Sequence, residues 1–156
     1  MSFHAKHIVI AGVFFFGLVF QSFGDIKDTL AYKMAILHTQ DIFPERRFLG
    51  RSTTPADATV SEFQWLLDSI KYRTTNSETE IADTIVEAWS ALKQKGHDMT
   101  ILETARQLSR VTKDTKLFGV DPVNFRVTSY VWLTSVLSGE NLETVLRRVL
   151  AQSQKQ

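Results

Sequence analysis

Four histidines are the residues in this sequence best suited to metal binding or acid–base chemistry. They stand at positions 4, 7, 38 and 97, and no two of them have the His-x3-His spacing that places two ligands on one helix face. The chain has no cysteine, which excludes thiolate ligands, thiol nucleophiles and disulfides. The sequence therefore predicts no metal site.

Three glutamates are the next candidates for acid–base work, but each of them follows a hydroxyl residue by three positions. The pairs are Thr59–Glu62, Ser77–Glu80 and Thr100–Glu103, and this spacing is typical of a capping box at a helix start. We expect the helix backbone to use these carboxylates. No G-x-S-x-G elbow, P-loop or Rossmann glycine pattern occurs. We therefore predict that the protein is not an enzyme, with no catalytic residues and no cofactor.

A cluster of arginines around a phenylalanine is the strongest candidate for binding. Arg46, Arg47, Phe48 and Arg51 lie in the stretch 39–58, which holds two of the three prolines and several Ser and Thr residues. This composition predicts a long loop. Guanidinium groups beside a phenylalanine suit a partner that carries carboxylates, or lipid head groups. We predict that the four residues bind a partner.

Trp65 is a further predicted partner-binding residue. The helix that contains it has an apolar stripe formed by Phe63, Leu66, Leu67 and Ile70, and Trp65 lies off this stripe. An exposed tryptophan is a good anchor for a protein partner.

Cap signals and apolar periodicity divide the chain after Gly24 into helices. An amphipathic helix is expected over 25–38, and five more at about 60–74, 78–95, 101–113, 122–137 and 141–153. Asp121 and Pro122 predict one helix start, and Gly96 and Gly139 are placed as C-terminal caps. The helix from Pro122 is apolar around most of its circumference, so we expect it at the centre. The predicted fold class is all-α, an N-terminal apolar signal or anchor helix followed by a five- to six-helix bundle.

The block Ile8–Phe20 is thirteen apolar or glycine residues long and follows Lys6. A positive start, an apolar run of this length and small residues at 22 and 24 are typical of a signal peptide cleaved after Gly24. The alternative is an uncleaved anchor, since Ile8–Gly24 is charge-free and just long enough to span a bilayer. Both interpretations make 1–24 the targeting segment and 25–156 one domain, periplasmic or otherwise extracytoplasmic, or secreted if the segment is cleaved. The predicted membrane residues are Ile8, Val9, Ile10, Val13, Phe14, Phe15, Phe16, Leu18, Val19 and Phe20.

All 17 acidic residues and 17 of the 18 Lys and Arg residues follow Gly24, so this part carries no net formal charge. Nucleic-acid binding needs a basic surface, and we expect none. The pattern around Gly96 has a superficial likeness to a helix-turn-helix, which we interpret as two helices joined by a tight turn.

Residues 25–95 resemble, in layout, the small periplasmic helical immunity proteins of type VI secretion systems. The similarity consists of an export signal, a short amphipathic helix, a proline-containing loop, a helix from Thr59–Val60 to about Tyr72, and a second helix ending in Ala88–Leu92. It implies a domain that binds and blocks a toxin enzyme. This chain lacks the cysteines usual in that family, so no site residue is carried over.

Together these features predict a non-enzymatic, exported or membrane-anchored helical protein-interaction module. Its expected role is that of an accessory or assembly subunit of an envelope or membrane complex, with protein partners. Two alternatives stay open: an immunity-type inhibitor of a partner enzyme, and a small-ligand binder or enzyme with a pocket between helices.

Overall fold

The structure is a computed structural model that describes residues 26–50, 53–117, 119 and 123–154. These ranges contain helices and no β-strand, which confirms the all-α class for this part of the chain. The elements are the 3-10 turn η1 (Ile26–Asp28) and the helices α3 (Leu30–Ile42), α4 (Pro44–Phe48), α5 (Asp57–Arg73), α6 (Glu78–Gln94), α7 (Ile101–Leu117), α8 (Phe125–Ser138) and α9 (Leu142–Gln154).

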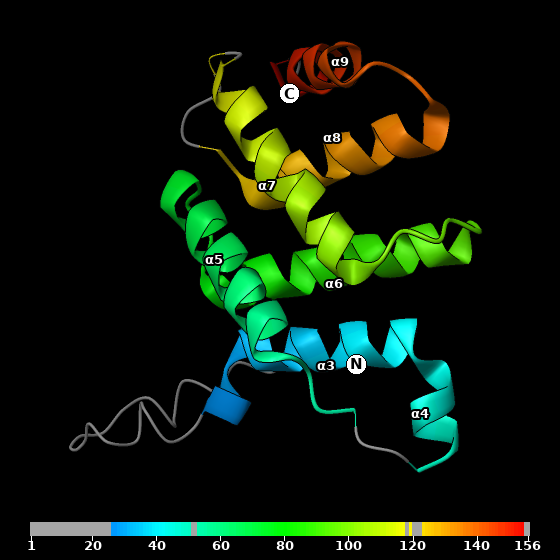
Figure 1. Cartoon of the computed structure of the whole chain (residues 1–156). Coiled ribbons are helices and arrows are strands. Elements are labelled where there is room, and N and C mark those ends of the chain that lie inside the picture. The colour runs from blue at the N-terminus through cyan, green and yellow to red at the C-terminus, as the bar shows by residue number, and fades with distance from the viewer. Residues whose placement is uncertain (1–25, 51–52, 118, 120–122, 155–156) are drawn as a thin grey trace, which may run out of the picture.

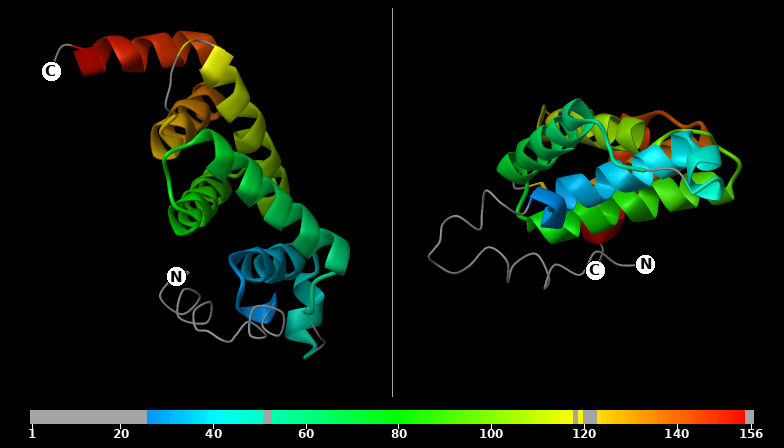
Figure 2. Two further views of the ribbon diagram at one scale, coloured as in Figure 1. Left: turned by 90° about the vertical axis from the view of Figure 1, so that its left-hand side faces the viewer. Right: turned by 60° about the horizontal axis from the view of Figure 1, so that its bottom comes forward.

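The helices form an elongated stack (Figure 1). α3 lies at one end, where it packs against α5, α6 and α7. α8 packs on the other side of α6 and α7, and α9 lies beyond α8 at the far end. The left view in Figure 2 shows the same order along the stack. The central helices are therefore α5, α6 and α7.

One apolar core runs through α3, α5, α6 and α7. The expected stripe of α5 is buried, with Phe63, Leu66, Leu67 and Ile70 at most 2 % exposed. Trp132 and Phe125 of α8 join this core. A second, smaller cluster consists of Val131 of α8 with Val145 and Leu146 of α9. The two ends of the stack are thus held by cores of very different size.

No helix in the described ranges is long and apolar enough to cross a bilayer. The predicted membrane block Ile8–Phe20 and the predicted cleavage site after Gly24 lie outside the described residues.

Local signals at both ends of α6 are confirmed. The Ser77 hydroxyl accepts from the amide of Glu80, and the Glu80 carboxylate accepts from the amide of Ser77, which is a complete capping box. At the other end Gly96 has φ +86°, and the amides of Gly96 and His97 donate to the carbonyls of Lys93 and Leu92. This is a Schellman motif, and the positive φ explains the glycine.

The start of α5 differs from the prediction. α5 begins at Asp57, with Ala56 at the N-cap and no side-chain cap, so Thr59 lies inside the first turn and the predicted capping box with Glu62 is wrong. The early start places Val60 in the core, where it is 6 % exposed. Burial of this side chain therefore outweighs the local capping signal.

The start of α8 was also predicted wrongly. The side-chain oxygen of Asn124 accepts from the amides of Arg126 and Val127, so α8 begins at Phe125 and not at Pro122. Val123 instead forms a parallel bridge with Thr74 in the connection between α5 and α6. This long-range pairing holds Val123 extended, and Asp121 and Pro122 lie outside the described residues.

α8 is not the enclosed central helix that its composition predicts. Val127 is 42 % exposed, Tyr130 61 % and Leu137 40 %, so one side of α8 faces solvent. Its other sides pack on α6, α7 and α9. The apolar residues around α8 therefore serve separate contacts with three neighbouring helices, and they do not indicate that α8 is fully buried.

The stretch 39–58 is only partly a loop. Thr39 is buried and its hydroxyl donates to the carbonyl of Ala35, so α3 continues through it to Ile42. Pro44 then opens the short helix α4 at its first position, where the missing amide hydrogen costs nothing. The described irregular part is residues 53–56, with a turn at 49–50.

Candidate protein-interaction surface

Trp65 lies on the outer face of α5. Its side chain is 61 % exposed, whereas its neighbours Leu66 and Leu67 are 2 % and 0 % exposed. The position off the apolar stripe is thus confirmed. A tryptophan left in water at this fraction keeps most of its apolar surface available to a partner.

Tyr72 shares this face and is 89 % exposed. It follows Trp65 by seven residues, which is two helix turns or about 10 Å along the axis. Tyr72 is not among the predicted partner-binding residues, although its spacing from Trp65 is a signal that could have identified it. We name the surface formed by Trp65, Asp68 and Tyr72 the α5 aromatic face.

Asp68 gives the α5 aromatic face an acidic group between its two rings. Its carboxylate accepts from Gln64 Nε2 at 2.9 Å, and the same amide nitrogen lies 3.1 Å from Glu78 Oε2 at the start of α6. Gln64 therefore links two carboxylates, and no described cation forms an ion pair with Asp68. The face combines apolar surface with a negative charge.

The predicted arginine cluster can be followed at one residue only. The Arg46 guanidinium lies 4.0 Å from the ring centroid of Phe43, so it stacks on its own chain, and its side chain is half-buried. The side chains of Arg47 and Phe48, and the whole of Arg51, lie outside the described residues. Arg46 and Trp65 come from different helices, α4 and α5, and no described contact joins them.

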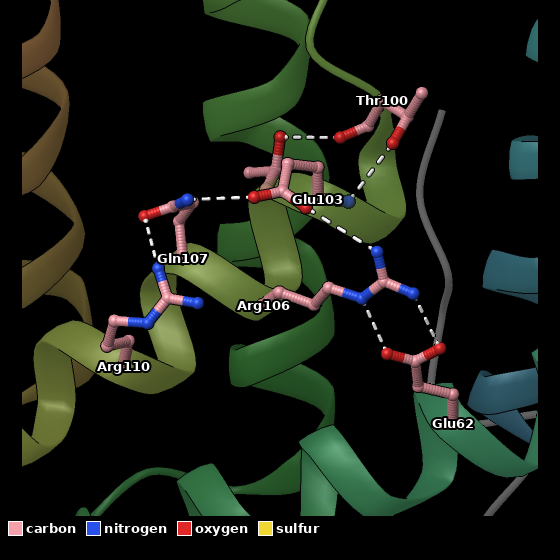
Figure 3. Close-up of polar contacts among 7 residues, drawn as sticks. Glu62, Thr100, Glu103, Arg106, Gln107 and Arg110 are labelled. Atoms are coloured by element: carbon pink, nitrogen blue, oxygen red, sulfur yellow. Dashed lines mark hydrogen bonds and ion pairs between the residues drawn. The ribbon is translucent and has the colours of Figure 1, made fainter.

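A polar network fixes α5 against α7, close to the start of both helices (Figure 3). Arg106 of α7 binds Glu62 of α5 through both carboxylate oxygens, with Nε–Oε2 at 2.6 Å and Nη2–Oε1 at 2.8 Å. This hydrogen bond lowers the pKa of Glu62 below its usual 4.5 and raises the pKa of Arg106. Glu62 is therefore held ionised, as a bridge between helices.

Glu103 completes the network instead of completing a capping box. The amide of Glu103 donates to the Thr100 hydroxyl at 3.0 Å, which is half of the predicted box. Its carboxylate turns away to accept from Gln107 at 2.8 Å and lies 3.5 Å from Arg106 Nη1. Of the three predicted boxes, only that of Ser77 and Glu80 forms in full.

His38 of α3 lies beside this network. Its ring meets the ring of Phe63 edge-on, with centroids 6.0 Å apart, and in the described part of the chain its buried Nδ1 has no hydrogen-bond partner. Burial lowers the pKa of His38 below its ordinary 6.5; Arg106 acts in the same direction, while Asp41 and Glu62 oppose it. The imidazole is thus favoured in its neutral form.

The described residues contain no group of three or more His, Asp or Glu side chains that could hold a metal ion. A carboxylate with a lowered pKa, locked to an arginine, does not donate a proton readily at neutral pH. The network of Glu62, Arg106 and Glu103 therefore has the chemistry of a structural ion bridge.

A scan against protein-family models finds no match to this sequence, and searches of curated proteins and of solved structures find none either.

Proposed function

We propose that this chain is a non-enzymatic helical interaction module that binds a protein partner through the α5 aromatic face. It serves as an accessory or assembly subunit of an envelope complex, to which its N-terminal segment delivers or anchors it. The observation that carries the proposal is the exposure of Trp65 and Tyr72 on one face of α5. Exposed aromatic side chains are enriched among the residues that dominate binding energy at interfaces.

The partner surface should match the two rings and the charge between them. Two apolar sockets about 10 Å apart would receive Trp65 and Tyr72. A Lys or Arg side chain between the sockets would pair with Asp68, which lies between the two rings in sequence. Among the described residues, its carboxylate accepts a hydrogen bond from the neutral amide of Gln64 and has no cationic partner. Such a pair becomes stronger when the interface excludes water.

Affinity purification of the full chain from its native membranes, after mild detergent extraction, tests the proposal. The double variant Trp65→Ala, Tyr72→Ala should lose at least about tenfold of the recovered partner, because truncating an interface anchor commonly costs more than 1.4 kcal/mol. Tyr130→Ala is a matched control, since Tyr130 of α8 is an aromatic residue with the same 61 % exposure as Trp65.

Recovery of the chain alone and fully soluble, or equal partner recovery with the double variant, would refute the proposal. A partner that proves to be an enzyme inhibited by the complex would instead favour the immunity-type inhibitor.

A further inference from the structure

A hollow of about 270 Å³ lies where the C-terminal end of α7, the start of α8 and the second half of α9 meet. Figures 1 and 2 show the end of α7 beside α9 from two directions. No residue of α5 lines the hollow, so its role is independent of the α5 aromatic face. The described lining residues are Thr115, Asn124, Val127, Thr128, Leu146, Val149, Leu150 and Ser153.

The hollow lies beside the less buried half of the apolar stripe of α9. Val145 and Leu146, in the first half, are 0 % and 3 % exposed and pack on Val131. Val149 and Leu150, one turn further, remain half-buried and face the hollow. Both side chains pack against the edge of the small cluster, and each leaves part of its apolar surface uncovered.

The hydroxyl hydrogens in the lining are already used. The Thr115 hydroxyl donates to carbonyls of α7, and the Thr128 hydroxyl donates to the carbonyl of Asn124. The Ser153 hydroxyl donates to the carbonyl of Leu150, and the side-chain oxygen of Asn124 caps α8. A polar ligand would lose its hydration here without gaining those donors.

Charge complementarity points the same way. None of the described lining residues is ionisable, so these residues offer no counter-ion to a charged group inside the hollow. Apolar cavities of this kind bind small hydrocarbons in place of water. The volume lies just below the range of about 300–1,000 Å³ that is typical of sites for drug-sized ligands, which favours one chain of medium length over a whole lipid.

We propose that the hollow between α7, α8 and α9 is a binding site for a single alkyl chain. The alkyl chain lies against Val127, Val149 and Leu150, and the polar end of the ligand remains in water at the mouth of the hollow. Asn124, Val127 and Ser153 are the exposed members of the described lining, so the hollow is open to solvent.

Two probes with the same eight-carbon alkyl chain and different polar ends test the proposal on the full-length protein: nonanoate and octyl glucoside, each below its micelle concentration. Methyl NMR of Val149 and Leu150 follows the site itself, separately from the apolar block Ile8–Phe20. Both probes should shift these methyl signals with affinities within about threefold of each other. Shortening the alkyl chain of either probe should weaken its binding about fourfold for each methylene removed, which corresponds to about 0.8 kcal/mol.

Val149→Trp should fill the hollow and weaken octyl binding at least tenfold while keeping the helical CD signal. Leu137→Trp is the matched control, since Leu137 lies on the exposed side of α8 outside the lining. Should the tryptophan variant fail to fold, Val127→Glu places a charge at the mouth and should give the same loss. Unshifted methyl signals, an affinity set by the head group, or equal losses in Val149→Trp and Leu137→Trp would overturn the proposal.

Discussion

Glu62 acquires its role from a residue that lies 44 positions further along the chain. Locally it is the third residue after a threonine, and the capping pattern assigns it to the backbone. In the fold, one edge of the Arg106 guanidinium, formed by Nε and Nη2, donates to both oxygens of the Glu62 carboxylate, so this side chain binds α7. Planar two-point pairing of this kind is directional, so it sets the register of α5 against α7 as well as holding them together.

His38 and Glu62 make stability depend on pH in the same direction. Each has a folded-state pKa below its ordinary value, 6.5 for His38 and 4.5 for Glu62, so the unfolded chain binds more protons near those values. Stability should be full above about pH 6.5, decline as the unfolded His38 protonates, and decline again below about pH 4.5. Urea unfolding of the full chain, followed by CD between pH 7.5 and 4, measures this.

The variant His38→Gln removes the titration near the network without adding charge. It should flatten the upper part of the profile, between about pH 7 and 5.5, and retain the decline at more acid pH. An unchanged slope in the upper window would show that His38 is not the group responsible.

Helix ends show which local signals decide a boundary. The Ser77 box and the Gly96 turn complete their hydrogen bonds within six residues, and the structure places both as expected. The boundaries that were predicted wrongly depend on distant contacts. Val123 is held extended by Thr74, and the amide of Phe125 donates to the side chain of Asn76, 49 residues away.

The hydroxyl of Ser77 caps a helix and that of Thr59 does not, and this difference should be measurable as a difference in stability. Ser77→Ala removes a side-chain acceptor from the first turn of α6 and should lower the free energy of unfolding by about 1 kcal/mol. Thr59→Ala is the paired variant, because Thr59 lies inside α5 and caps nothing. It should change stability by less than about 0.5 kcal/mol. Equal losses for the two substitutions in urea unfolding would contradict this assignment.

Across the whole molecule, the apolar stripes predicted most of the core of α3 and α5 to α7, because these helices bury one face each. The position of α8 could not be read in the same way, since a helix that touches three neighbours partially looks like one that is enclosed. Trp65 could be found because it lies off a clear apolar stripe, whereas the hollow depends on how closely α7, α8 and the second half of α9 approach one another. A gap between packed helices cannot be predicted from the spacing of apolar residues along the sequence.

The unequal cores predict that α9 opens before the rest. α9 is held on α8 chiefly by Val145 and Leu146, and its ion pairs Arg147–Glu143 and Arg148–Glu140 are on the surface, where they add little. Native-state hydrogen exchange should give α9 amides a lower opening free energy than those of α6. Equal protection in the two helices would mean that the stack unfolds as one unit.

With the N-terminal segment retained as the proposed anchor, the order of the stack would make the domain a spacer. Ile26 lies at the α3 end and α9 at the opposite end (Figure 1). A short, stiff anchor directly ahead of η1 would attach at the α3 end and leave α9 at the opposite end of the domain, with α5 on the flank between them (Figure 1). On a membrane crowded with such domains, the flank would contact neighbouring membrane-bound molecules, and the α9 end would contact molecules that approach from solution.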